Sequence, residues 1–152
     1  MARFLATNGV RYLTEGILMS AKESLTLVMN HLKLSDAFLE HIVEVNDKKV
    51  DIKIVFRENE LTTLQQEALS YLSQVSFYHL ETVKTNCCFN EDLLLLSSMN
   101  PTEFHEKESK HMGMLIERKQ DEVLYKEVIQ ETYALLSEAT KVSFTQEVAT
   151  PV

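Results

Sequence analysis

The sequence predicts an α/β protein with a mixed, mostly parallel sheet flanked by helices. Only three glycines and two prolines occur in 152 residues, so we expect long elements and few loops. Apolar residues make up 45% of the chain, which is enough for a sizeable core. Segments with the periodicity of strands alternate with segments of helical periodicity, and strands joined by helices run parallel as neighbours.

The first half of the chain alternates helix and strand. Apolar residues recur at every third or fourth position in residues 10–21, which predicts a helix, and residues 24–29 alternate as strands do. Ser35 and Asp36 are typical of a helix start, and an apolar stripe follows them. Residues 50–56 alternate cleanly and predict a second strand.

The middle of the chain continues this alternation and then becomes rich in strands. Residues 61–72 predict a helix in which Leu64 is one of three apolar residues spaced four apart, and residues 75–79 predict a short strand. Residues 83–89 and 93–97 predict a hairpin around the polar break Asn90-Glu91-Asp92. Because hairpin strands run in opposite directions, this pair is expected to be antiparallel.

The C-terminal part adds one more strand and a long helix. Residues 112–117 predict the strand, and residues 121–139 predict a helix with Leu124, Val128 and Leu135 on its buried side. A polar segment follows. We therefore expect a single domain over residues 1–140 and a flexible C-terminal tail over residues 141–152.

The net charge of −8 disfavours several classes of partner. An acidic surface repels nucleic acid and anionic lipid, although a local basic groove remains compatible with this charge. No apolar run reaches the roughly 18 residues that a membrane-spanning helix needs, and the N-terminus lacks the layout of a signal peptide. The expectation is a cytoplasmic protein without membrane contact.

The two cysteines, Cys87 and Cys88, are adjacent in the sequence. Neighbouring residues of a strand point to opposite faces, so the two thiols are poorly placed to bond to each other. We expect both to be reduced. No histidine or further cysteine follows at ligand spacing, so the sequence predicts no metal site and no cofactor.

The most informative stretch is the end of the predicted hairpin, Ser97-Ser98-Met99-Asn100. Together with Asn90 ten residues before Asn100, it resembles the second half of the motif of the phospholipase D-like superfamily: Asp or Asn, then a strand that ends in Gly-Ser-x-Asn. Short segments such as His31-Leu32-Lys33-Leu34 are similar to segments of the short bacterial single-domain members of this superfamily. The resemblance covers roughly residues 4–138 and implies a phospholipase D-like sandwich.

The resemblance implies a specific chemistry for the matching residues. In that superfamily a histidine attacks phosphorus, a lysine and the Ser-x-Asn pair hold the phosphate oxygens, and a downstream glutamate orients a histidine. Ser98 and Asn100 stand at the Ser-x-Asn positions, and Ser97 replaces the glycine. Two copies of the motif face each other, so a short chain with one motif is expected to form a homodimer.

The first half of the motif, His-x-Lys, is missing. In the spacing of short members, Lys84 stands at the histidine position and Asn86 at the lysine position, whereas in the longer spacing these positions hold Val83 and Thr85. His111 stands where the glutamate is expected. Three replacements at the chemical positions predict that phosphohistidine catalysis is lost, which leaves no predicted catalytic residue.

Several roles stay open for these side chains. Lys84, Asn86, Ser98 and Asn100 are candidates for holding a phosphate or another anion, by charge and by hydroxyl or amide donors. Ser98 and Asn100 are also the residue types that hydrogen-bond nearby backbone at a strand end. Lys84 and Asn86 also suit a solvated strand face, and His111 suits either packing or proton transfer.

Three functions follow as hypotheses. The first is a catalytically inactive phospholipase D-like domain that acts as a binding, scaffold or regulatory protein through dimerisation. The second is a phosphodiesterase or nuclease with altered chemistry that uses Lys84 and His111. The third is half of an active site that another chain completes. The acidic charge favours a protein partner over a long nucleic acid.

Overall fold

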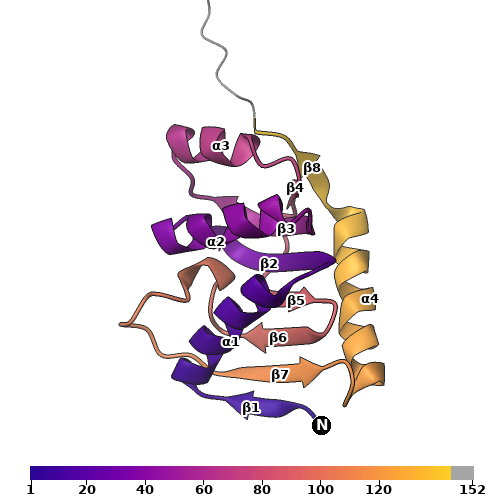
Figure 1. The fold of residues 1–152 in the computed structure, drawn as a ribbon. Helices are drawn as coiled ribbons and strands as arrows, with labels where there is room; N and C mark the ends of the chain where they lie inside the picture. The colour runs from indigo at the N-terminus through magenta and orange to yellow at the C-terminus, as the bar shows by residue number, and fades with distance from the viewer. Residues whose placement is uncertain (145–152) are drawn as a thin grey trace, which may run out of the picture.

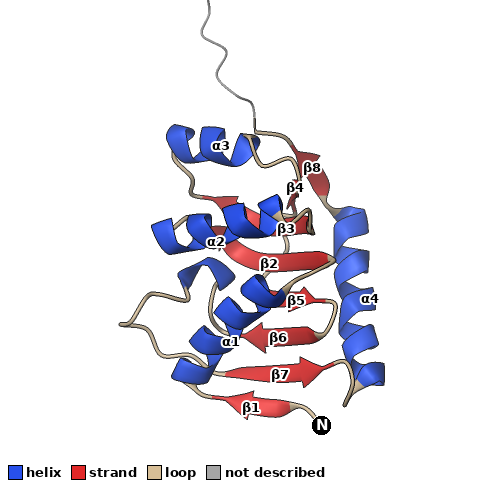
Figure 2. Ribbon diagram, in the orientation of Figure 1, coloured by secondary structure: helices blue, strands red, loops and turns tan. Residues whose placement is uncertain are grey.

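The computed structural model describes residues 1–144. Its helices are α1 (Thr7–Ser20), α2 (Asp36–Asp47), α3 (Thr63–Ser70) and α4 (Glu122–Glu138), with the short 3-10 helix η1 (Pro101–Glu103). Its strands are β1 (Arg3–Leu5), β2 (Ser24–Leu32), β3 (Asp51–Asn59), β4 (Val75–His79), β5 (Asn86–Asn90), β6 (Leu93–Ser97), β7 (Gly113–Glu117) and β8 (Thr140–Val142). All eight strands form one sheet in the order β1-β7-β6-β5-β2-β3-β4-β8 (Figures 1 and 2).

The sheet is mixed, as predicted, but most of its neighbouring strands are antiparallel. Only β2–β3 and β3–β4 are parallel, and the other five pairs are antiparallel. The expectation of a mostly parallel sheet was therefore wrong. A parallel pair needs a crossover, and only α2 and α3 join sheet neighbours in this way, whereas β5 and β6 are joined by a tight turn.

The two faces of the sheet carry separate apolar layers. On one face, α1, α2 and α3 cover alternate strand residues such as Leu27 and Ile54, both fully buried. On the other face, α4 covers the intervening residues, among them Val28, Val55 and Leu94. Since strand side chains alternate between faces, each central strand contributes to both layers. In Figure 1, α1 and α2 lie in front of the sheet and α4 lies to its right, across the strand ends.

Local capping explains where two of the helices begin. The Ser35 hydroxyl accepts a hydrogen bond of 3.1 Å from the backbone N–H of Phe38, which confirms the helix start predicted at this serine. Thr62 and Gln65 form a reciprocal capping box at the start of α3. Both contacts lie within three residues of the helix end, but the sequence analysis identified only the one at Ser35.

Two apolar residues predicted to face the core are exposed instead. Leu64 is 78% exposed because α3 is short and buries Leu69 rather than the predicted row. Leu124, predicted on the buried side of α4, is 39% exposed, while Tyr125 and Thr132 occupy the buried side. The apolar periodicity therefore identified both helices, and Val128 and Leu135 of the predicted α4 row do pack, partly buried, against the core, whereas Leu64 and Leu124 do not.

The edges of the sheet are formed by two strands that the sequence did not predict. β1 and β8 have three residues each, which is too short to show a period of two. β8 pairs with β4, and the Phe144 ring packs against Phe77 with centroids 4.6 Å apart. Residues 141–144, expected to begin a flexible tail, are thus packed on the sheet, and residues 145–152 lie outside the described part.

Candidate functional site

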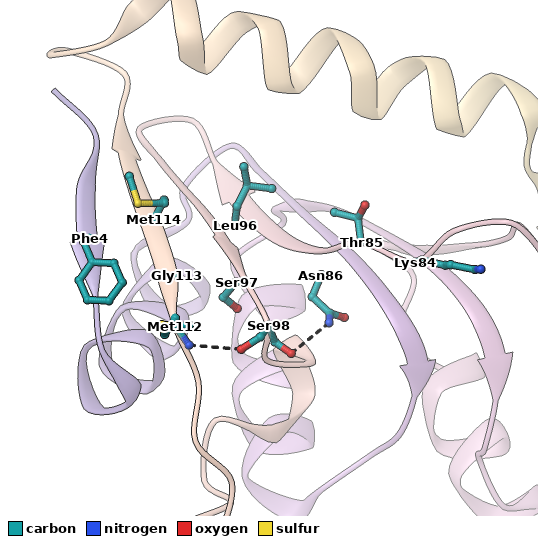
Figure 3. Close-up of a pocket in the computed structure, with 10 residues that line it drawn as sticks. All are labelled: Phe4, Lys84, Thr85, Asn86, Leu96, Ser97, Ser98, Met112, Gly113 and Met114. Carbon is teal, nitrogen blue, oxygen red and sulfur yellow. Dashed lines mark hydrogen bonds between the residues drawn. The ribbon is translucent and has the colours of Figure 1, made fainter.

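The predicted site residues surround a groove where β5 begins and β6 and β7 meet the loops (Figure 3). Strand pairing brings these ends together, since Asn86 lies opposite Ser97 and Ser97 lies opposite Gly113. The groove has a volume of about 710 Å³. It is lined by Phe4, Lys84, Thr85, Asn86, Leu96, Ser97, Ser98, Met112, Gly113 and Met114. We call this surface the motif groove.

Asn86 lines the motif groove, but its amide already has partners within the chain. Its Oδ1 accepts a hydrogen bond from the backbone N–H of Asn30 at 3.3 Å. Its Nδ2 donates to the backbone carbonyl of Ser98 at 3.3 Å, so it links the start of β5 to the end of β6. The amide therefore holds the groove together, and one donor hydrogen is left for a ligand.

Ser98 and His111 are the two side chains of the site that are best placed for proton transfer. The Ser98 hydroxyl lies 3.1 Å from His111 Nδ1 and also accepts a hydrogen bond from the backbone N–H of Met112 at 3.2 Å. The backbone of His111 is fixed in turn by the hydroxyl of Thr7, which accepts from its N–H at 2.9 Å and donates to its carbonyl at 3.1 Å. The imidazole is therefore held beside an exposed hydroxyl at the rim of the groove.

Lys84 does not lie on a strand. β5 begins at Asn86, three residues later than the predicted strand over residues 83–89, so Lys84 is not part of the strand face on which it was expected. The backbone carbonyl of Lys84 accepts a hydrogen bond from Asn30 Nδ2 at 2.9 Å, while its side chain is exposed and points away from Ser98 (Figure 3). Lys84 is thus an exposed charge at the rim, and its side chain is not directed at Ser98.

Asn100, the residue that carried most of the resemblance, does not line the motif groove. Its side chain is only 6% exposed. Its Oδ1 accepts from the backbone N–H of His31 at 3.2 Å, and its Nδ2 donates to the Thr102 hydroxyl at 2.8 Å. These bonds join β6 to β2 and to η1, so in this arrangement Asn100 stabilises the strand end.

Asn90, at the Asp or Asn position of the motif, is also committed to structure. It is 2% exposed, and its Nδ2 donates to the Ile17 carbonyl and the Ser20 hydroxyl at 3.0 Å. Its Oδ1 accepts from the backbone N–H groups of Asp92 and Leu93 at 2.9 Å, which closes the hairpin turn. Every hydrogen-bonding group of this amide is therefore satisfied.

The thiols of Cys87 and Cys88 are free and buried, as expected, and lie in the two separate apolar layers. Burial raises the pKa of the Cys87 thiol to about 12 and raises that of Cys88 well above its ordinary value. Because the thiolate is the reactive form, neither cysteine offers a nucleophile near neutral pH.

A second, more apolar groove adjoins the first, between the sheet and α4. Its volume is about 320 Å³, and it shares Thr85 and Leu96 with the motif groove. The exposed Leu124 contributes to its wall. The two grooves together make an extended surface along β5, β6 and α4.

Sequence reasoning missed Thr7 and Asn30, which position the site residues. Thr7 is separated from His111 by 104 positions, and Asn30 is separated from Asn86 by 56. Neither residue belongs to a motif, so no pattern in the chain indicates these contacts. The separations show that the site is assembled by the sheet topology.

Three solved structures share this architecture. Nuc from Salmonella typhimurium, a phospholipase D family member, aligns with a TM-score of 0.73 at 12% identity, over 94% of this chain and 99% of that one. NucT from Helicobacter pylori aligns with a TM-score of 0.72 at 11% identity, over 93% and 99%. Phosphatidylserine synthase from Haemophilus influenzae aligns with a TM-score of 0.76 at 12% identity, over 94% of this chain but only 40% of that one.

The comparisons by sequence add nothing to this. The chain matches no protein-family model and no curated protein. Among the described residues, no helix is long and apolar enough to cross a membrane. At identities of 11–12% the structural likeness concerns the course of the backbone, and on that ground this chain has the phospholipase D-like fold.

Proposed function

We propose that this chain is a catalytically inactive phospholipase D-like domain that acts by binding, as a homodimer that pairs through the motif groove. The observation that carries the proposal is the state of the amides at the motif positions. Asn100 uses its oxygen and one amide hydrogen on His31 and Thr102, and Asn86 is bonded to Asn30 and Ser98. These amide groups stabilise the fold by hydrogen bonds within the chain, and most of their donors and acceptors are therefore not available to a phosphate. At the spacing that the motif requires before Asn90, the sequence also offers no His-x-Lys.

The rim of the motif groove supports an interaction surface. Three large apolar side chains lie exposed on it: Phe4 at 60%, Met112 at 66% and Met114 at 39%. Phenylalanine and methionine are enriched in protein interfaces, and apolar residues clustered at one place mark such surfaces. β1, which carries Phe4, is also an edge strand with unpaired backbone groups.

A second copy of this chain suits the surface better than nucleic acid does. The net charge of −8 opposes a polyphosphate ligand, and among residues 1–144 Lys84 is the only charged residue that lines the motif groove. A dimer through this face would join the motif groove of one copy to the motif groove of the other in one shared site. This is the pairing that the sequence resemblance implies. A bacterial source and a cytoplasmic location belong to the same proposal and rest on the sequence alone.

Light scattering tests the pairing. The purified chain is expected to have the mass of a dimer at two concentrations, and Met112→Glu is expected to give a monomer because it buries a charge in the interface. Leu64→Glu is the matched control, since Leu64 is also largely exposed but lies on α3, away from the groove. A monomeric wild type, or a Met112→Glu protein that stays dimeric, would contradict the proposal.

The Ser98–His111 contact favours a second candidate, a phosphodiesterase with altered chemistry. The 3.1 Å separation is within the range in which a histidine accepts a proton from a hydroxyl. Lys84 would supply charge from the rim. Asn100 is engaged within this chain, so the same observations give less support to a site completed by a different protein.

An assay with single- and double-stranded DNA in EDTA separates the two candidates. The binding proposal expects no cleavage by the wild type. The phosphodiesterase candidate expects cleavage that His111→Ala abolishes and Lys84→Ala weakens, whereas Lys107→Ala, which removes an exposed charge outside the groove, leaves it unchanged. Cleavage that survives His111→Ala would come from a contaminant and would end the second candidate.

A further inference from the structure

Two histidines and a glutamate meet on the face of the sheet that α1, α2 and α3 cover, and none of them lines the motif groove. Glu15 belongs to α1, His41 to α2, and His105 to the segment that follows η1. Glu15 Oε2 lies 3.1 Å from His41 Nε2 and 3.2 Å from His105 Nε2. The three potential ligand atoms all lie within 4.8 Å of one another. The fold thus brings together three segments that are distant in sequence.

We propose that Glu15, His41 and His105 bind one divalent transition-metal ion, with Zn²⁺ as the reference metal. Two imidazoles and one carboxylate are a common ligand set for zinc in proteins. In a tetrahedral site with bonds of about 2.0–2.1 Å, neighbouring ligand atoms are about 3.3 Å apart. The two distances from Glu15 Oε2, 3.1 and 3.2 Å, are close to that edge, and the third pair, the two imidazole nitrogens, lies within 4.8 Å, so binding would require the histidines to adjust only around an oxygen that both already contact.

The surroundings hold both imidazoles in place. The ring of Phe104, which is only 4% exposed, stacks on His41 with centroids 5.5 Å apart and an interplanar angle of 10°. The same ring contacts His105 at 4.6 Å. A buried aromatic ring between two histidines restricts their rotamers before any ion arrives, and such restriction lowers the entropic cost of binding.

The site is open to solvent on one side. The side chains of Glu15 and His105 are 40% and 56% exposed, and that of His41 is 21% exposed. An ion would therefore have a path of entry, and water would complete its coordination. Because both histidines now contact one carboxylate oxygen, they also form simple hydrogen bonds without an ion, and the experiment has to distinguish these two states.

The proposed metal site includes a residue of the segment that leads to the motif groove. His105 lies in the segment between η1 and β7, and the same segment carries His111 to Ser98. Arg11 of α1 already contacts this segment through the carbonyl of Ser109 at 3.1 Å. A metal would add a second link between this segment and the helices, six residues before His111, which Thr7 and Ser98 already hold. This inference does not depend on the proposed function.

A second cluster serves as an internal control. His31 Nδ1 lies 3.2 Å from Glu58 Oε2 and 2.6 Å from Glu60 Oε2. Strand register explains this proximity, since His31 and Glu58 are direct partners on β2 and β3. With one imidazole and two exposed carboxylates, the cluster is a poorer ligand set for zinc than two imidazoles and one carboxylate.

Titration calorimetry with ZnCl₂ on the untagged, EDTA-treated chain tests the proposal. We expect one ion per chain, and a loss of affinity of at least about tenfold in His41→Ala, His105→Ala and Glu15→Gln. His31→Ala, the matched control, is expected to bind as the wild type does. With Co²⁺ in place of Zn²⁺, the wild type is expected to show the strong visible absorption of four-coordinate Co²⁺. His105→Ala is expected to lose this absorption.

Three results would overturn the proposal. These are the absence of saturable binding, binding that all three variants retain, and binding that His31→Ala abolishes. His105 is exposed, so its replacement is not expected to unfold the chain, and equal thermal unfolding of wild type and variant in EDTA would verify this. The readouts are metal binding and absorption, so failure of the proposed dimer would leave this test unaffected.

Discussion

Leu94→Ala is expected to lower the free energy of unfolding by about 2–5 kcal/mol, the range for deletion of a large buried aliphatic side chain. Leu94 is fully buried in β6, opposite Phe89 and Ile116. It packs in the layer between the sheet and α4, where Tyr125 closes the opposite side. The adjacent strands and helix surround the site, so we expect the cavity to persist rather than collapse. Urea unfolding at one protein concentration measures the loss.

Leu96→Ala is the matched control on the same strand. Leu96 points to the same face as Leu94 but is only partly buried and lines the motif groove. The same chemical change therefore removes less buried surface, and we expect a clearly smaller loss than for Leu94→Ala. Equal losses for the two variants would mean that α4 does not cover this face as the structure has it.

Gly113→Ala is expected to destabilise the chain by about 1–3 kcal/mol, the usual cost of overpacking. A Cβ at this position would lie 2.9 Å from the carbonyl oxygen of Leu96 and 2.9 Å from Ser97 Cβ. It would also lie 3.1 Å from the Val10 side chain. The backbone of β6 cannot move away without disturbing its pairing with β7, so the glycine is required by space.

Gly16→Ala provides the opposite result within the same protein. Gly16 lies in the middle of α1, and a Cβ there would meet no atom within 4 Å. Alanine is favoured over glycine inside a helix by about 1 kcal/mol, so this variant is expected to unfold at a higher urea concentration than the wild type. Destabilisation by Gly16→Ala, or an unchanged Gly113→Ala, would contradict the packing described for these two positions.

The elements that the sequence predicted well are those specified by close neighbours. Ser35 caps α2 through a residue three positions away, and the turn of the β5–β6 hairpin is closed by Asn90 on the next residues of the chain. Strand β4 was predicted with its correct ends. The three-residue strands β1 and β8 escaped prediction because they exist only through pairing with β7 and β4.

The candidate site was predicted less well than the fold. Of the motif residues, Asn86 and Ser98 do line one groove. The motif pattern did not show that the amide of Asn100 turns inward, or that Lys84 lies before the strand and points away. Side-chain direction at a strand end depends on bends and loops that have no periodic pattern.

Residue type and local spacing were therefore enough to specify an α/β fold, most element positions and the region of the motif. Contacts between distant segments decided the rest. The pairing of β5 with β2 made the sheet mostly antiparallel, Thr7 placed His111 beside Ser98, and α1, α2 and the segment after η1 brought Glu15 to His41 and His105. Such contacts depend on how the layers pack, and packing joins residues whose separation in the sequence carries no information about their distance in space.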